Sequence, residues 1–374
     1  MPAKKILLVA NTAWNLWNYR SGLISKLIES GYDVVLAAPG DRFQKKLRET
    51  FPCRFIPLQQ LARRSFSIIQ NARCLSECFH LFRRERPDLV LLFTIKPNIL
   101  GNFAAWLAGT STLSIIEGMG YAGTHAARWY WFAAPMYRLA LQQPGKVIFL
   151  NQDDKRAFCR HHLIKPEQAL VIHGPGVNTE QFQPAGYRKS AKIVFLYCGR
   201  FLIEKGIREF VEAARQLKRQ YTNLEFQVLG SPDPGNPATI SKTELQTWKQ
   251  TQDIRILGSA DDVRPYLAQA DVLVLPSYYR EGVPRSVLEA MAMEKIIVTT
   301  DTPGCRDTVD DGQTGFLIPP KNVEALIAAM QKICTLSPEL RRQMGTSARK
   351  KVMQEFSDVQ VLPQYLEVIK SLVC

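Results

Sequence analysis

Two carboxylates, Glu281 and Glu289, lie eight positions apart in a setting that could do chemistry. Gly282 and Pro284 lie between them, soon after the apolar run 272–275, which is typical of a buried parallel strand. Proline fits the first turn of a helix because its missing N–H would have no partner there. The pattern therefore places Glu281 in a strand-to-helix loop and Glu289 near the second turn of the helix.

This arrangement suits a sugar nucleotide. The free N–H groups at the start of a helix can bind a phosphate, and flanking carboxylates can accept hydrogen bonds from hydroxyl groups. Two exposed helix glutamates without a function are the alternative when the pair is taken alone.

A second run, 198–206, carries two cations directly after an apolar strand expected at 193–197. Gly199 lets the backbone turn sharply. Arg200 can bind a phosphate bidentately and Lys205 acts as a point charge, so both can reach a diphosphate above the strand end. A surface loop with two exposed cations is the alternative.

The two runs resemble the Glu-x7-Glu and Gly-Arg…Lys-Gly motifs of retaining glycosyltransferases of family 4, which have the GT-B fold. The resemblance implies that Glu281 contacts the donor sugar, Glu289 the ribose, and Arg200 and Lys205 the diphosphate. Glu281, Arg200 and Lys205 are then the expected catalytic residues, and no general base is assigned. The remaining expected donor-binding residues are Gly199, Gly282, Val283, Pro284 and Arg285. We expect a nucleotide sugar, UDP-linked, as donor and no cofactor.

The run 118–123 spells G-x-G-x-x-G, which taken alone indicates a dinucleotide-binding site. It follows the fifth expected strand rather than the first, and no acidic residue lies about 20 positions on, so NAD binding is disfavoured. We expect Gly118, Gly120 and the nearby His125 to contact the acceptor or the donor sugar. A surface histidine without a role is the alternative for His125.

Two further segments are candidates for acceptor binding. Residues 11–20 are expected to form the loop after the first strand, and their polar and aromatic composition, with Trp14, Asn15 and Asn18, suits a sugar. Many family members have Gly-Gly there, and this chain resembles the subset that builds bacterial surface glycans and lipid-linked oligosaccharides. Lys96 ends the fourth strand and can meet an acceptor phosphate. Packing tryptophans and an exposed lysine are the alternatives.

Apolar runs alternate with helix-like segments along the whole chain, which predicts an α/β protein with parallel sheets. A Gly- and Pro-rich piece at 174–186 divides two such series, so we expect two facing Rossmann-like domains with an interdomain cleft. The first is residues 1–186 and the second is 187–356. By resemblance to GT-B proteins, the final helix, 357–374, returns to the first domain. The expected strands are 6–10, 34–37, 54–57, 89–93, 113–116, 147–150, 193–197, 226–229, 254–257, 272–275 and 296–299.

The net charge of +14 is uneven. Residues 1–186 hold 23 Lys and Arg against 12 Asp and Glu, whereas residues 187–374 hold 25 against 22. A basic half can meet an anionic membrane surface. The segments 61–86 and 126–141 combine aromatic, apolar and basic residues, as interfacial helices do, although a core-facing helix with an arginine-rich outer side is equally compatible.

Composition limits the remaining choices. No apolar run of about 18 residues occurs, and no metal-site pattern is recognised. No signal peptide is recognised and the cysteines form no Cys-x-x-Cys pair. We therefore expect a cytoplasmic protein, peripheral on the inner membrane face. The expected acceptor is a polyprenyl-diphosphate-linked sugar or polysaccharide. A sugar-nucleotide epimerase or hydrolase, a phosphorylase and a non-catalytic sugar-nucleotide-binding protein remain alternatives. Nucleic-acid binding is disfavoured by Glu281 and Glu289.

Overall fold

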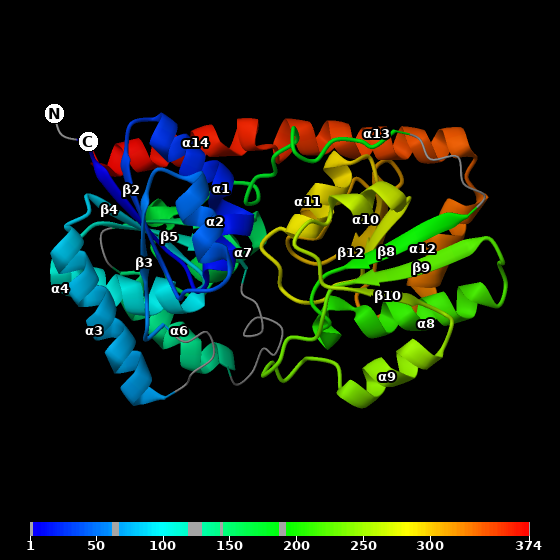
Figure 1. Ribbon diagram of the computed structural model, residues 1–374, viewed down its shortest axis with the longest axis horizontal. Helices are drawn as coiled ribbons and strands as arrows, with labels where there is room; N and C mark the ends of the chain where they lie inside the picture. Colours follow the sequence, from blue (N-terminus) through cyan, green and yellow to red (C-terminus); the bar gives the residue numbers. More distant parts are fainter. Residues whose placement is uncertain (1–2, 62–66, 119–128, 143–144, 187–191, 374) are drawn as a thin grey trace. The chain divides into compact units, whose positions relative to one another are not determined.

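The computed structural model describes residues 3–61, 67–118, 129–142, 145–186 and 192–373, and its chain forms two compact units (Figure 1). Unit 1 contains Met1–Gly176 and Asp358–Cys374, and unit 2 contains Val177–Ser357. The boundary lies earlier than the one expected after Gly186. Its position has a local cause, because the Val177 N–H donates to the Phe356 carbonyl at 3.0 Å and ties the connection to the end of unit 2.

Unit 1 is built on a parallel sheet with the strand order β3-β2-β1-β4-β5-β6-β7. Six of its strands lie where apolar runs predicted them, and only β7 gave no signal, because three residues are too few to show a pattern. The strands are β1 (Lys5–Val9), β2 (Asp33–Ala38), β3 (Arg54–Pro57), β4 (Leu89–Phe93), β5 (Thr112–Ile116), β6 (Lys146–Phe149) and β7 (Ala169–Val171).

Helices cover both faces of this sheet (Figure 1). Helix α14 packs against α1 and β4, so the last segment of the chain completes unit 1. On the other face α3 packs against α4, and the π-helix η1 contacts α3 and α6. The helices are α1 (Ala13–Glu29), α2 (Phe43–Thr50), α3 (Ile68–Glu85), η1 (Pro97–Gly101), α4 (Asn102–Ala108), α6 (Trp129–Ala140), α7 (Gln152–Arg160), η2 (Pro166–Gln168) and α14 (Asp358–Val373).

One expected loop is in fact helical. Residues 11–20 were expected as a loop, but α1 begins at Ala13. Thr12 is its N-cap, and the Thr12 hydroxyl accepts a hydrogen bond from the Asn15 N–H at 3.0 Å. A side-chain acceptor at this position satisfies an N–H group that otherwise has no partner, which stabilises the start of the helix.

Unit 2 repeats the architecture with the strand order β10-β9-β8-β11-β12-β13. Its strands are β8 (Ile193–Cys198), β9 (Leu224–Leu229), β10 (Arg255–Gly258), β11 (Val272–Leu275), β12 (Ile296–Thr300) and β13 (Gly315–Ile318). Its helices are η3 (Ile203–Lys205), α8 (Ile207–Lys218), α9 (Lys242–Gln250), α10 (Arg264–Gln269), α11 (Arg285–Ala292), η4 (Arg306–Thr308), α12 (Val323–Thr335) and α13 (Pro338–Glu355).

Strand β13 was not predicted from the sequence. Gly315 begins this strand beside β12. A Cβ atom at residue 315 would lie 1.9 Å from the Ile297 carbonyl oxygen, so the close approach of the two backbones requires glycine.

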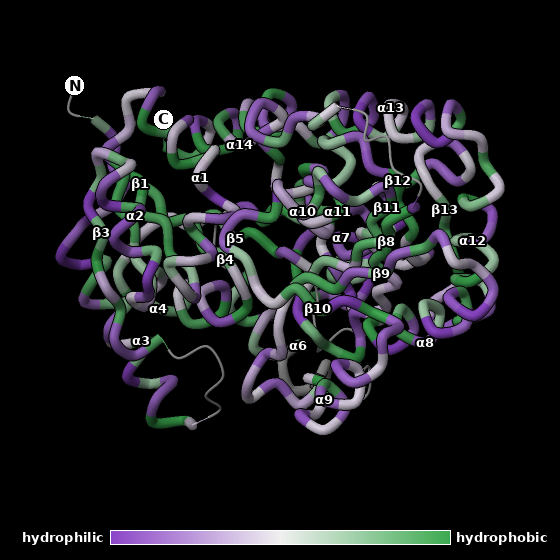
Figure 2. Tube along the Cα trace, turned by 45° about the vertical axis from the view of Figure 1, so that its right-hand side comes forward, coloured by the Kyte–Doolittle hydropathy of each residue, from purple (hydrophilic) through white to green (hydrophobic). Residues whose placement is uncertain are grey.

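The strands of both sheets are almost continuously apolar because helices cover both faces. Every residue of β4, β8 and β11 is buried. Figure 2 shows hydrophobic stretches along central strands such as β8 and hydrophilic stretches on outer helices such as α8. Among the described residues, no helix is long and apolar enough to cross a membrane.

Each sheet has a point where the strand order reverses, between β1 and β4 in unit 1 and between β8 and β11 in unit 2. In open parallel sheets, ligands bind beyond the carboxyl ends of the strands at such a switch point. In unit 2 the loops that begin there contain the Arg200–Lys205 and Glu281–Glu289 motifs.

Candidate active site

The loop after β8 brings Arg200 and Lys205 to the switch point of unit 2. The Tyr197 hydroxyl donates to the Arg200 carbonyl at 3.0 Å, which fixes the first turn of the loop. Gly206 ends the loop with φ +74°, and a Cβ atom there would lie 2.1 Å from the Pro276 carbonyl oxygen. Glycine therefore allows the loop after β8 to lie directly against the end of β11.

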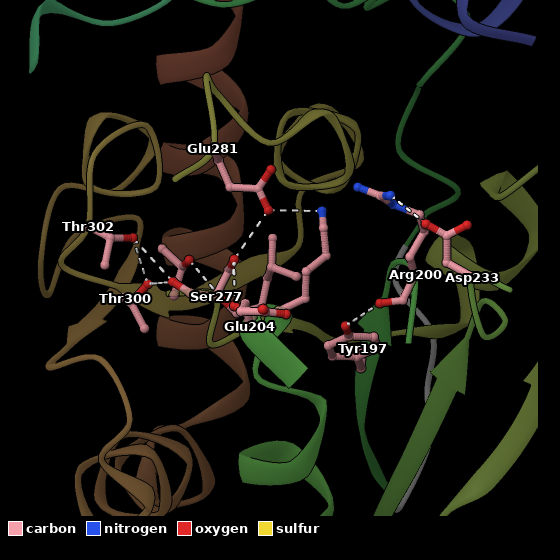
Figure 3. Close-up of polar contacts among 11 residues, drawn as sticks. Tyr197, Arg200, Glu204, Asp233, Ser277, Glu281, Thr300 and Thr302 are labelled. Atoms are coloured by element: carbon pink, nitrogen blue, oxygen red, sulfur yellow. Dashed lines mark hydrogen bonds and ion pairs between the residues drawn. The ribbon is translucent and has the colours of Figure 1, made fainter. Parts of the chain in front are cut away.

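The loop after β11 is attached to the loop after β8 by its backbone. The N–H groups of Tyr278 and Tyr279 both donate to the Glu204 carbonyl at 2.8 Å. The Ser277 carbonyl accepts hydrogen bonds from the Thr300 and Thr302 hydroxyls (Figure 3). These bonds hold the segment before Glu281 from both sides.

Lys205 and Glu281 meet at this junction. The Lys205 ammonium lies 2.9 Å from Glu281 Oε1, and the Ser277 hydroxyl donates to the same oxygen at 3.2 Å (Figure 3). The two charged side chains are only 14% and 12% exposed. Partial burial strengthens their attraction relative to a pair in water.

Arg200 pairs with a carboxylate that the sequence did not indicate. Its Nη1 donates to Asp233 Oδ2 at 2.8 Å, and Asp233 is buried. Burial lowers the pKa of Arg200, but Tyr279, Asp233 and Glu281 outweigh it, so the pKa of Arg200 is raised. Arg200 is therefore a permanent cation beside the Lys205–Glu281 pair.

Helix α11 holds the second glutamate. Pro284 is the N-cap of this helix, one residue before the first turn in which we expected it. Helix ends commonly shift by one or two residues. Arg285 Nε lies 3.2 Å from Glu289 Oε1. Burial raises the pKa of Glu289 and Arg285 offsets this only in part. Glu289 is thus a shielded carboxylate able to accept hydrogen bonds.

The segment between the two glutamates is closely packed. Val283 is buried, and Gly282 lies against Gly304. Gly304 has φ +79°, and a Cβ atom there would lie 2.2 Å from the Gly282 carbonyl oxygen. Glu294, just after the end of α11, adopts the left-handed conformation with φ +60°.

The expected acceptor residues at the start of α1 differ in exposure. Trp14 is 41% exposed, and its ring packs edge-on against Tyr19 at 5.1 Å. The Asn18 side chain donates to the Trp14 carbonyl at 3.0 Å. Asn15 is buried, so its side chain is shielded from solvent.

Lys96 and Gly118 follow the neighbouring strands β4 and β5 of unit 1. Lys96 is half-buried before η1, and burial is the main cause that lowers its pKa. Gly118 has φ +104°, a conformation that favours glycine. These two residues therefore lie at adjacent strand ends. Gly120 and His125 lie outside the described residues.

Two residues that make contacts at this site were not predicted from the sequence. Ser277 and Asp233 belong to no motif that we recognised, and their partners are brought to them only by the fold. A polar residue directly after an apolar strand, such as Ser277 after β11, is the only signal that could have indicated one of them. Among the described residues, no group of three or more His, Cys, Asp or Glu side chains could hold a metal ion.

Comparison with known proteins identifies the family of this chain. Residues 178–351 match the family model for glycosyl transferases group 1, and residues 16–175 match that for a glycosyl transferase 4-like domain. The chain is 26% identical to N,N'-diacetylbacillosaminyl-diphospho-undecaprenol alpha-1,3-N-acetylgalactosaminyltransferase of Campylobacter jejuni, across 97% of this chain and 98% of that protein. It is 25% identical to UDP-Gal:alpha-D-GlcNAc-diphosphoundecaprenol alpha-1,3-galactosyltransferase of Escherichia coli, across 79% of this chain and 78% of that protein.

Solved structures show the same fold. Sucrose-phosphate synthase of Thermosynechococcus elongatus aligns with a TM-score of 0.80 at 21% identity, covering 99% of both chains. Anabaena Alr3699/HepE in complex with UDP and glucose aligns with a TM-score of 0.79 at 18% identity, covering 98% of this chain and 100% of that one. Because the two family models divide nearly the whole chain between them, this protein belongs to the family 4 glycosyltransferases, which are retaining enzymes with the GT-B fold.

Proposed function

We propose that this glycosyltransferase transfers a hexose or an N-acetylhexosamine from a UDP-linked donor to a lipid-linked or polysaccharide acceptor at the cytoplasmic membrane face. The observation that carries the proposal is the Lys205–Glu281 pair at the switch point of unit 2. It combines a phosphate-binding cation with a carboxylate that can accept hydrogen bonds from sugar hydroxyls. The names of the two relatives, which contain diphospho-undecaprenol acceptors, support the lipid-linked class.

The reaction is a substitution at the anomeric carbon of the donor sugar. The bond from the anomeric carbon to the β-phosphate oxygen breaks, and a bond from that carbon to an acceptor hydroxyl oxygen forms on the same face. Arg200 and Lys205 stabilise the negative charge on the departing diphosphate, which is usually the largest contribution to catalysis. Glu281 positions the donor sugar and Glu289 the ribose.

The acceptor proton passes to an oxygen of the departing phosphate, so no protein base is assigned. Two fixed cations beside the diphosphate supply the charge for which other glycosyltransferases use a divalent metal. We therefore propose turnover without a metal cofactor.

Exposed apolar side chains on the outer helices α3 and α4 of unit 1 support membrane contact. Ile68 and Ile69 begin α3, and Ile68 is 86% exposed. Trp106 on α4 is 60% exposed, and exposed arginines occur on α3 and α6. Aromatic and apolar groups beside basic ones bind the interface of anionic membranes. We propose that these helices place unit 1 on the membrane that holds the lipid acceptor.

A donor and acceptor screen tests the proposed reaction. Release of nucleoside diphosphate from UDP-, GDP- and ADP-sugars would be followed with and without a polyprenyl-diphosphate-linked sugar. Acceptor-dependent release from one UDP-sugar is expected. Release without any acceptor would instead indicate a hydrolase or epimerase, and binding of the donor without release would indicate a non-catalytic binding protein.

Co-sedimentation with vesicles tests the membrane contact separately. Vesicles with phosphatidylglycerol should bind the protein, and phosphatidylcholine vesicles should bind it less. The double variant Ile69→Ser/Trp106→Ser should bind more weakly, whereas Leu340→Ser, which changes an exposed leucine in unit 2, should not differ from the unmodified protein. Equal binding to both kinds of vesicle, or no binding, would contradict the proposal.

A further inference from the structure

The loop between β9 and α9, residues 230–241, packs along the loop that carries Arg200. The Phe201 N–H donates to the Ser231 carbonyl at 2.9 Å, and the Ile240 N–H donates to the Phe201 carbonyl at 3.1 Å. The Ile203 N–H donates to the Ala238 carbonyl at 2.8 Å. The backbone on both sides of the 230–241 loop is therefore bonded to the segment that follows Arg200.

Glycine at the start of this loop makes the contact possible. Gly230 has φ +141°, which side chains rarely allow, and a Cβ atom there would lie 1.9 Å from the Gly199 carbonyl oxygen. The two loops thus touch at the residue directly before Arg200.

Asp233 is fixed within the 230–241 loop. Its N–H donates to the Thr239 hydroxyl at 2.9 Å, and its carboxylate accepts from the Asn236 side chain at 3.3 Å. Asp233 is 8% exposed, whereas the Arg200 side chain is 38% exposed. The ion pair between them therefore joins a buried carboxylate to a more exposed side chain, so we expect the carboxylate to set the direction of the guanidinium.

We propose that Asp233 is a positioning residue that orients Arg200 toward the diphosphate of the nucleotide donor. The inference rests on the proposed function, which gives Arg200 its ligand. A long arginine side chain loses rotamer freedom when it is fixed, and Asp233 fixes it before the donor arrives. The contact uses Nη1 of Arg200, and the guanidinium has five N–H donors in all, so donors remain for phosphate oxygens.

The charge of Asp233 distinguishes a positioning role from simple packing. A carboxylate near a diphosphate repels it, so a purely structural residue here would be better neutral. Asp233→Asn keeps the size of the side chain and removes the charge that attracts Arg200.

Calorimetry with UDP and UMP tests the inference without relying on turnover. UDP should bind the unmodified protein more tightly than UMP, because only UDP offers the second phosphate. Asp233→Asn should reduce the UDP-to-UMP affinity ratio by about tenfold, a size that is usual for coupled neighbours. UMP affinity should change less than threefold, which a general loss of structure would not allow.

The Arg200→Ala background gives the decisive comparison. There Asp233→Asn should cause no further reduction in the ratio, since the residue that it positions is missing. Glu244→Gln is the matched control, because Glu244 accepts from Arg208 at 2.7 Å on helices α8 and α9 outside the 230–241 loop, and it should leave the ratio unchanged. If Asp233→Asn does not fold, Thr239→Val, which leaves the carboxylate but removes the hydroxyl that accepts from the Asp233 backbone N–H, should reduce the ratio to a smaller extent.

The outcomes separate the two proposals. An unchanged ratio in Asp233→Asn, or equal and additive losses in both backgrounds, would overturn the role of Asp233 while leaving the donor site intact. A protein that binds UDP no better than UMP would overturn the diphosphate role of Arg200, and with it both proposals.

Discussion

The ammonium group of Lys205 lies 2.9 Å from a carboxylate oxygen of Glu281, and this ion pair joins the loop after β8 to the loop after β11. The two strands are neighbours at the point where the strand order of unit 2 reverses. Two residues that lie far apart in the sequence are thus brought together where parallel sheets bind ligands. A diphosphate that approaches Lys205 must share it with Glu281, so donor binding and the position of Glu281 are coupled.

Replacement of Lys205 by methionine removes the charge at nearly constant size. We expect turnover to fall by about 10²–10³-fold, as when an electrostatic contact to a transition state is lost. The unfolding free energy measured in urea should fall by about 1–3 kcal/mol, because Glu281 keeps only part of its hydrogen bonding in a poorly hydrated place. The double variant Lys205→Met/Glu281→Gln should recover stability but not turnover. If it is destabilised by the sum of the single variants, the two side chains are not coupled.

Replacement of Arg200 by alanine should lower turnover sharply without unfolding the protein. The loop around Arg200 is held by backbone bonds and by the Tyr197 hydroxyl, none of which needs the guanidinium. Removal of the guanidinium leaves the buried Asp233 carboxylate without its cation, so the unfolding free energy should fall by about 1–3 kcal/mol while the protein stays folded. Arg208→Ala, which removes an ion pair of α8, is the control and should stay active. A fully active Arg200→Ala enzyme would refute the diphosphate role.

Glu289→Gln should separate function from stability. Burial raises the pKa of Glu289, so the folded protein holds this proton more tightly than the unfolded chain does. The resulting stability is present at low pH and is lost as the pH rises through the raised pKa. Glutamine carries no charge, so the variant should be at least as stable as the unmodified protein at pH 7, while its nucleotide affinity falls. Urea unfolding at pH 7 and at about pH 4 measures this difference, which should shrink at the lower pH. If Glu289→Gln were less stable than the unmodified protein at pH 7 but not at about pH 4, the charged Glu289 would stabilise the fold, and the prediction would be wrong.

Two glycines test how closely the site is packed. Gly304 and Gly312 have φ +79° and +75°, but only at Gly304 would a Cβ atom meet backbone, the Gly282 carbonyl at 2.2 Å. Gly312→Ala should cost about 1–2 kcal/mol from its backbone conformation alone. Gly304→Ala should cost more and also weaken donor binding, because the Glu281–Gly282 segment must shift. Equal losses of stability and unchanged donor affinity would show that the contact is unimportant.

Much of the fold could be predicted from the sequence because its strands are buried on both faces and read as apolar runs. The short strand β7 and the glycine-initiated strand β13 lack such a run, and their positions are set by pairing with β6 and β12. The start of α1 was missed because Thr12, a good N-cap, follows an expected strand and precedes a polar, aromatic segment.

The charged residues of the proposed donor site could be picked out from the sequence because motif spacing and strand ends coincide. Lys205 and Glu281 lie in such motifs, and their meeting follows from the order of β8 and β11. Asp233 and Ser277 could not be recognised, because each is identified only by its contact with Arg200 or Glu281, and these contacts form only in the folded chain. The pairing of Asp233 with Arg200 depends on the close approach of Gly230 to Gly199, which no local pattern reveals.

The most direct measurement is the release of UDP from a UDP-sugar in the presence of a polyprenyl-diphosphate-linked sugar, compared between the unmodified enzyme and Lys205→Met. We expect acceptor-dependent release by the unmodified enzyme, with the anomeric configuration of the sugar retained in the product, and release at least a hundredfold slower by Lys205→Met. Equal release by the two proteins, or a product of inverted configuration, would contradict a donor site built on Lys205 and Glu281.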